Sequence, residues 1–144
     1  MTDPDPDDVR TRAAHQFIAA LPHCVALDMA VEQVAPGRAV ISMPWAEALV
    51  GDPRTGVVHG GAVSALMDTA GGAAVLSHPE AGRTTATMDL RIDYMRAAAP
   101  RQTITATAIC HTVTRSVAFV RAEAADAEGV VAQATGTFTL DDRR

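Results

Sequence analysis

The second half of the chain is dominated by alternating apolar and polar residues, the pattern of β-strands that bury one face. Residues 84–95 show it most clearly, because their side chains separate into two sets. The apolar set is Met88, Leu90, Ile92 and Tyr94, and the polar set is Thr87, Asp89, Arg91 and Asp93. Residues 103–113, 116–126 and 130–140 continue the alternation with short turns between them, which predicts consecutive antiparallel strands.

The period changes to that of a helix near the N-terminus. Residues 9–20 place apolar side chains three or four positions apart, and Pro22 ends the pattern. The apolar positions are Val9, Ala13, Phe17 and Ala20. This spacing predicts a helix over these residues. The acidic, proline-containing residues 1–8 are expected to form a flexible tail.

The clearest helix is central and begins at two glycines, Gly60 and Gly61. A hairpin over residues 27–45 and a loop over residues 46–59 are expected to precede it. One apolar arc of this helix consists of Val63, Leu66, Met67, Ala70, Ala73 and Ala74. A second arc has small side chains and a single carboxylate: Ser64, Asp68, Gly71 and Gly72.

The order of these elements predicts an α+β fold over residues 9–142 as a single domain. A long central helix is covered by one antiparallel sheet of about six strands, and an N-terminal helix lies beside them. The outward-facing strand residues are mostly Thr, Arg, Asp and Gln, so the other face of the sheet is expected to be polar. The small-residue arc and the edges of the sheet are better candidates for contact between subunits.

Composition narrows the possible functions. The 12 basic residues are all arginine and are outnumbered by 17 acidic ones, giving a formal net charge of −5 and no basic run that would favour nucleic acid. We find no signal peptide and no apolar stretch of transmembrane length, so we expect a cytoplasmic protein with no membrane partner. Cys24 and Cys110 lack the spacing of metal ligands and are expected to be buried thiols.

The segment GDPRTGVVHGGAVSALMDTAGG, residues 51–72, carries the candidate chemistry. Backbone N–H groups at the start of a helix attract negative charge, and glycine allows a substrate carbonyl to come close to them. Asp68 lies two turns further along the same helix. A carboxylate near a site that stabilises an oxyanion is suited to acyl transfer.

The motif HGGAVSALMDTA, with His59 followed by two glycines and an acid nine residues after it, resembles the hotdog-fold thioesterases of the phenylacetate-degradation (PaaI-like) type. The strand TTATMDLRIDYMRAA resembles the same family, and the resemblance covers roughly residues 25–140. It implies hydrolysis of a coenzyme A thioester to a free acid and the thiol. It also implies that no metal or redox cofactor takes part. Coenzyme A is then part of the substrate and not a cofactor.

The resemblance also implies roles for single residues. Asp68 matches the acid that attacks the thioester or activates water, and Gly61 matches the glycine whose N–H polarises the carbonyl. His59 matches the motif histidine that orients the loop or the thioester end, and Thr87 matches a residue that positions water. The family often has Asn on the loop before the glycines, where this chain has Asp52. Substrate contacts are further expected from Gly60 and Ser64.

The same resemblance implies a homodimer or a homotetramer with the active site between subunits. One subunit would then supply Asp68 and the facing subunit Thr87. For the phosphates of coenzyme A the candidates are Arg91, Arg96 and Arg115.

Two other functions are compatible with the fold. A hydratase acting on enoyl thioesters is disfavoured, because the central helix has Asp68 but no histidine before His78. A non-catalytic acyl-CoA-binding module would need the pocket without a working carboxylate. The sequence does not distinguish aryl from medium-chain acyl substrates.

Overall fold

The computed structural model describes residues 3–141. Its helices are α1 (Pro6–Ala20), α2 (Pro22–Ala26) and α3 (Gly60–Ser77), with a short 3₁₀ helix η1 (Glu47–Leu49). Its strands are β1 (Ala30–Ala35), β2 (Arg38–Met43), β3 (Val50–Asp52), β4 (Val57–Val58), β5 (Thr87–Tyr94), β6 (Ile104–Val113), β7 (Val117–Asp126) and β8 (Gly129–Thr139). The long helix and the strands therefore follow the order that the sequence predicts.

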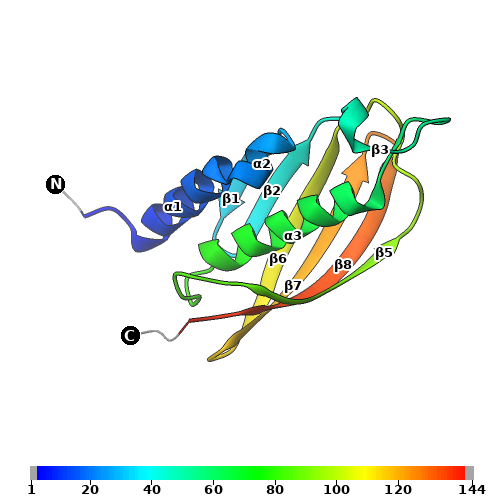
Figure 1. Ribbon diagram of the computed structural model, residues 1–144. Helices are drawn as coiled ribbons and strands as arrows, with labels where there is room; N and C mark the ends of the chain where they lie inside the picture. Colours follow the sequence, from blue (N-terminus) through cyan, green and yellow to red (C-terminus); the bar gives the residue numbers. More distant parts are fainter. Residues whose placement is uncertain (1–2, 142–144) are drawn as a thin grey trace.

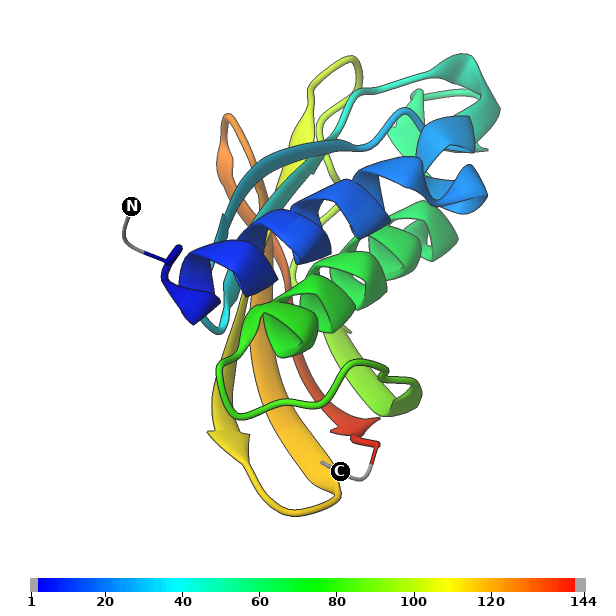
Figure 2. The ribbon, with the colours of Figure 1, turned by 90° about the vertical axis from the view of Figure 1, so that its left-hand side faces the viewer.

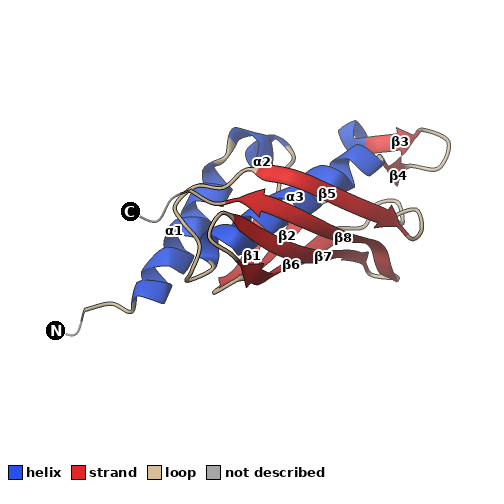
Figure 3. Ribbon diagram, turned by 90° about the horizontal axis from the view of Figure 1, so that it is seen from below, coloured by secondary structure: helices blue, strands red, loops and turns tan. Residues whose placement is uncertain are grey.

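A single six-stranded sheet in the order β1-β2-β6-β7-β8-β5 forms the body of the molecule, and all its pairs are antiparallel. Helix α3 lies along one face of this sheet (Figure 1). Seen from below, the sheet lies over α3 with β5 at one edge, and the small β3–β4 hairpin projects from the end where α3 begins (Figure 3). The predicted α+β hotdog architecture is confirmed.

Small side chains allow α3 to pack closely on the sheet. All six residues of the predicted apolar arc are buried. Fully buried alanines from α3 face alanines of the central strands, so the backbones of helix and sheet approach closely. Gly71 is part of this fit, because a Cβ atom there would lie 2.8 Å from Cζ of Phe138 on β8.

Helix α1 begins earlier than the sequence pattern predicts. It begins at Pro6, because the Asp5 side chain accepts a hydrogen bond from the Asp7 N–H and proline suits the first helical position. The expected tail therefore ends earlier than residue 8, and residues 1 and 2 lie outside the described part. Figure 2 shows α1 and α3 side by side on the same face of the sheet.

The buried face of α1 is one position away from the apolar positions of the sequence pattern. Ala14 and Ile18 are its buried residues. Val9 and Phe17, which belong to that pattern, are 48% and 57% exposed. Periodicity identified an apolar stripe on α1 correctly, but not which side of the helix packs on α3 and β1.

Strand β5 contains an irregularity that matters for the site. Its pairing with β8 shifts between Thr87 and Asp89, so that two residues of β5 lie opposite one residue of β8. Such a β-bulge turns the side chains before it to the other face of the strand. Thr87, which strict alternation places on the outer face with Asp89, therefore reaches α3 instead.

Candidate active site

His59 caps the N-terminus of α3. Its Nδ1 atom accepts a hydrogen bond from the Gly61 N–H at 2.8 Å, so the ring proton lies on Nε2. The end of η1 holds the cap in place, because the His59 N–H donates to the Leu49 carbonyl at 2.7 Å. Strand β3 packs closely beside it, since a Cβ at Gly51 would lie 2.8 Å from the His59 Cα. The predicted oxyanion donor is therefore already occupied by His59 in this structure.

Tyr94 is a site residue that the sequence did not identify. From the end of β5 its hydroxyl donates to the Gly60 carbonyl at 2.9 Å and contacts the Ser64 hydroxyl. Ser64 also donates to the Gly60 carbonyl, at 3.1 Å. Because the Gly60 carbonyl and the Gly61 N–H belong to one peptide unit, this peptide is held at its oxygen by Tyr94 and Ser64 and at its nitrogen by His59.

Asp68 meets Thr87 further along the helix. The Thr87 hydroxyl donates to Oδ1 of Asp68 at 2.6 Å. Within the described residues the other carboxylate oxygen, Oδ2, has no hydrogen-bond partner. The two predicted catalytic residues are thus brought together, but within a single chain. The expectation that a facing subunit supplies Thr87 was wrong, because the bulge in β5 turns Thr87 towards α3.

Asp52 does not take part in this cluster. Its carboxylate accepts hydrogen bonds from the N–H and guanidinium of Arg54, which hold its pKa below its usual range. The predicted loop over residues 46–59 thereby contains the β3–β4 hairpin, whose turn Asp52 and Gly56 shape; Gly56 has a φ of 80°. In this structure Asp52 stabilises a turn rather than contacting Asp68.

The three arginines proposed for phosphate contacts are scattered. Arg91 pairs with Asp93 on the exposed face of β5. Arg96 is bound to Asp126 and to the Gly129 carbonyl, so its guanidinium has structural partners. Arg115 lies in the β6–β7 turn, next to Ser116, whose carbonyl accepts from the Leu140 N–H at the end of β8. They do not form a common phosphate site.

Comparison with known proteins places this constellation in a family. The model of the Thioesterase superfamily matches residues 55–133, which is 79 of the 144 residues and includes His59, Gly61, Asp68 and Thr87. The chain belongs to the thioesterase superfamily. The PaaI-like hotdog resemblance that the HGG motif suggested is thereby confirmed.

Solved structures of similar proteins can be aligned with most of this chain. A Pseudomonas aeruginosa protein is 34% identical, with a TM-score of 0.79 over 91% of this chain and 98% of that one. A variant of the phenylacetic acid degradation protein PaaI from Thermus thermophilus is 29% identical, with a TM-score of 0.74 over 84% and 100% of the two chains. The PaaI protein of E. coli shares the fold, at 22% identity and a TM-score of 0.81 over 92% and 96%.

A curated relative is matched over a shorter stretch. A protein of Halobacterium salinarum that is named as an esterase is 41% identical over 76 residues. This match spans 50% of each of the two chains.

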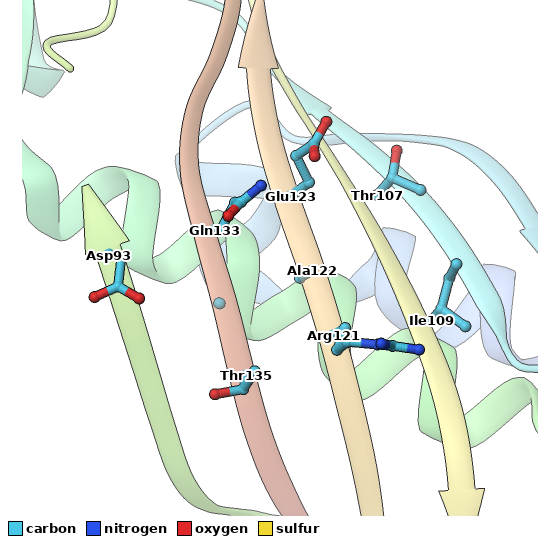
Figure 4. Close-up of a pocket in the computed structure, with 9 residues that line it drawn as sticks. Asp93, Thr107, Ile109, Arg121, Ala122, Glu123, Gln133 and Thr135 are labelled. Carbon is cyan, nitrogen blue, oxygen red and sulfur yellow. The ribbon is translucent and has the colours of Figure 1, made fainter. Parts of the chain in front are cut away.

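Other features of this thioesterase-superfamily chain lie apart from the Asp68 cluster. A hollow of about 540 Å³ on the outer face of the sheet is lined by polar residues of β5, β6, β7 and β8, with Ile109 and Ala122 among its apolar ones (Figure 4). That face is polar as predicted. Cys24 and Cys110 are free and buried, and burial raises the pKa of the Cys110 thiol to about 11, so neither is a candidate nucleophile.

Among residues 3–141, none of the helices combines the length and the hydropathy of a transmembrane span. Three or more His, Cys, Asp or Glu side chains do not gather there in a group that could hold a metal ion.

Proposed function

We propose that this protein hydrolyses acyl-coenzyme A thioesters, with Asp68 as its catalytic carboxylate. The observation that carries the proposal is the pair formed by Asp68 and Thr87 beside a small-residue face of α3. Thr87 fixes one carboxylate oxygen and leaves the other available. A carboxylate oriented in this way can act as a general base or as a nucleophile.

The reaction needs only substrate and water. In the base route, Asp68 takes a proton from water as the water oxygen bonds to the thioester carbonyl carbon, giving a tetrahedral oxyanion. The C–S bond then breaks, the carbonyl re-forms, and the departing thiolate of coenzyme A takes up the proton. In the nucleophile route, an Asp68 oxygen bonds to the carbonyl carbon and the C–S bond breaks, which gives an anhydride and the thiolate of coenzyme A. Water then hydrolyses the anhydride to the free acid and the Asp68 carboxylate, and the proton released protonates the thiolate. Both routes give a free acid and the thiol without a cofactor.

The oxyanion must be stabilised by a hydrogen-bond donor, for which we propose the Gly61 N–H. Within one chain this donor lies too far from Asp68 for both to act on the same carbonyl. Gly61 and Asp68 lie on one face of α3, but seven residues of helix separate them by about 10 Å. One carbonyl cannot contact both within a single chain. A second copy whose α3 runs antiparallel would bring Gly61 of one chain to Asp68 of the other. We therefore propose an active site shared between subunits of a homodimer or a dimer of dimers.

Substrate binding must also change the cap of α3. The Gly61 N–H can bind an oxyanion only when the His59 imidazole gives it up. The proposed role of His59 is therefore to keep the N–H oriented and occupied until the thioester oxygen replaces Nδ1. The Gly60 carbonyl keeps its bonds to Tyr94 and Ser64 during this exchange, so the peptide need not turn.

The first prediction concerns Asp68→Asn, which keeps the size of the side chain and removes its basicity. We expect kcat for acyl-CoA hydrolysis to fall by about 10²–10⁴-fold, the usual contribution of a general base. A thiol-release assay with aryl and fatty acyl-CoA esters measures this. Glu123→Gln, the same change on the outer face of the sheet, serves as control and should retain activity.

The assay also separates the alternative functions. Full activity of Asp68→Asn would refute the role of this carboxylate. If no ester is hydrolysed while acyl-CoA still raises the melting temperature, the chain is an acyl-CoA-binding module.

A further inference from the structure

A hollow of about 750 Å³ lies between α1 and the loop that follows α3, a volume typical of ligand pockets. Its apolar walls come from Val9, Ala13 and Phe17 of α1, from Leu76 of α3 and from Pro79 of the loop. We propose that this hollow binds the hydrocarbon tail of a medium-chain fatty acyl thioester. The inference rests on the proposed function and assigns a substrate class to it.

The first observation is the exposed apolar stripe on α1. Val9, Ala13 and Phe17 follow one another at four-residue spacing, and Phe17 is 57% exposed. An exposed phenylalanine ring lacks the favourable free energy that its burial away from water would provide. Within the described residues no other element covers this stripe. The loop over residues 79–85 curves towards it.

The loop is fixed in that position by Arg10. The guanidinium donates to the carbonyls of Ala81 and Gly82 at 2.9 and 3.3 Å. These bonds satisfy loop carbonyls and tie the loop to α1. The hollow is therefore formed before a ligand arrives, which reduces the ordering cost of binding.

The second observation is that the hollow continues the face of α3 that bears Asp68. Leu76 lies eight residues further along, about 12 Å from Asp68. Between them is Gly72, where an added Cβ would meet nothing within 4 Å, so the surface of α3 is open at this position. On the strand side, Thr85 lines the hollow two residues before Thr87.

This distance selects among the substrate classes that the sequence leaves open. An extended chain of about ten carbons spans 12 Å, at a little less than one bond length per carbon. An aryl group attached next to the carbonyl ends before Leu76. A tail that crosses Gly72 and ends against Phe17 would bury its own apolar surface and that of the Phe17 ring.

The test compares tail length with and without Phe17. Binding of the thioethers S-decyl-CoA and S-ethyl-CoA, which cannot be hydrolysed, is measured by calorimetry for wild type, Phe17→Asp and Gln16→Asp. Gln16 is an exposed neighbour on α1 that does not line the hollow. We expect wild type to prefer the decyl compound by more than ten-fold. Phe17→Asp should reduce that preference about ten-fold, equivalent to about two methylenes losing their apolar contact, and Gln16→Asp should not.

A second variant tests the path rather than the wall. Gly72→Leu places a side chain on this path and should shift the preference of binding towards the short thioether, measured on protein whose oligomeric state matches that of wild type. An unchanged decyl-to-ethyl ratio in Phe17→Asp would overturn the proposal. So would a change in oligomeric state with that variant, since the hollow would then be a contact between copies. Because the thioethers report binding alone, failure to hydrolyse decanoyl-CoA and acetyl-CoA would count against the proposed function and not against this site.

Discussion

Tyr94 offers the sharpest test at the scale of single residues. Its hydroxyl holds the oxygen of the same peptide whose N–H is the proposed oxyanion donor. Tyr94→Phe keeps the ring against Gly60 and removes the hydroxyl, and with it this bond and the contact with Ser64. We expect kcat and kcat/KM to fall together by up to about ten-fold, the value of one hydrogen bond, because the donor is used mainly in the transition state.

Ser64→Ala is the companion variant, because it removes the second bond to the Gly60 carbonyl. We expect it to lower kcat and kcat/KM together as well, but by a smaller factor. Melting temperatures should change little in either variant, since both hydroxyls lie near the surface. A rise in KM with unchanged kcat in Tyr94→Phe would mean that Tyr94 binds substrate and does not position the peptide.

The sequence predicted the residues of the site that lie on one element and missed those that depend on two. The glycines and Asp68 follow from the start and period of one helix. Tyr94 is a site residue only because β5 ends beside the start of α3, which no local pattern encodes. Thr87 was identified, but on the wrong face, because a bulge interrupts the alternation on which its placement depended.

At the scale of elements, Arg96 and Asp126 join two connections of the sheet. Both guanidinium nitrogens of Arg96 bind the carboxylate, which also accepts from the Ala99 N–H at 2.8 Å and the Glu128 N–H at 2.9 Å. The Asp126 side chain is 0% exposed and that of Arg96 31%. This pair connects the segment after β5 with the β7–β8 turn.

We expect Asp126→Asn to lower the free energy of unfolding by about 1–3 kcal/mol, because buried charged hydrogen bonds are lost. The Arg96 guanidinium, followed by the two N–H groups, holds the pKa of Asp126 well below its usual range. A depressed pKa stabilises the fold above the unfolded value of about 3.9, and this stabilisation is lost as pH falls towards the folded value. The difference in stability between wild type and variant should therefore be constant above pH about 5 and shrink below pH about 4.

Urea denaturation at several pH values measures this difference. Asp93→Asn is the matched control, because Asp93 and Arg91 form a pair with side chains 62% and 74% exposed, and such surface pairs contribute little. A difference for Asp126→Asn that does not shrink in acid would show that packing, rather than the carboxylate charge, makes this residue important.

Most element types and the buried face of α3 were predictable here, but the buried face of α1 was not. Proline and glycine positions and the change of period located α1, α3 and the six strands of the large sheet, and missed α2 and the β3–β4 hairpin. The face of α1 could not be chosen, since Ala14 and Ile18 form a stripe as regular as that of Val9 and Phe17. Contact with α3 decides between them, and that contact is a property of the assembled fold.

The proposed function makes a single chain an incomplete enzyme. The sheet ends at β5, whose outer edge has no neighbouring strand among residues 3–141. An edge strand of this kind can pair with a second copy about a two-fold axis. Such pairing would also set the two α3 helices antiparallel, as a shared Gly61 and Asp68 require.

Mixing two inactive variants tests this arrangement directly. Asp68→Asn lacks the carboxylate, and Gly61→Pro lacks the backbone N–H in the first turn of α3, where no bond to the helix itself is lost. The proline ring must displace the His59 side chain, because a Cβ at Gly61 would lie 2.9 Å from His59 Nδ1. In a mixed dimer, one active site carries both changes and the other carries neither. Because random exchange makes half of the dimers mixed, an equal mixture should recover about a quarter of wild-type activity. Circular dichroism and sedimentation of each variant alone must show a folded dimer. If the oxyanion donor and Asp68 act within one chain, every chain in the mixture is defective and no activity returns.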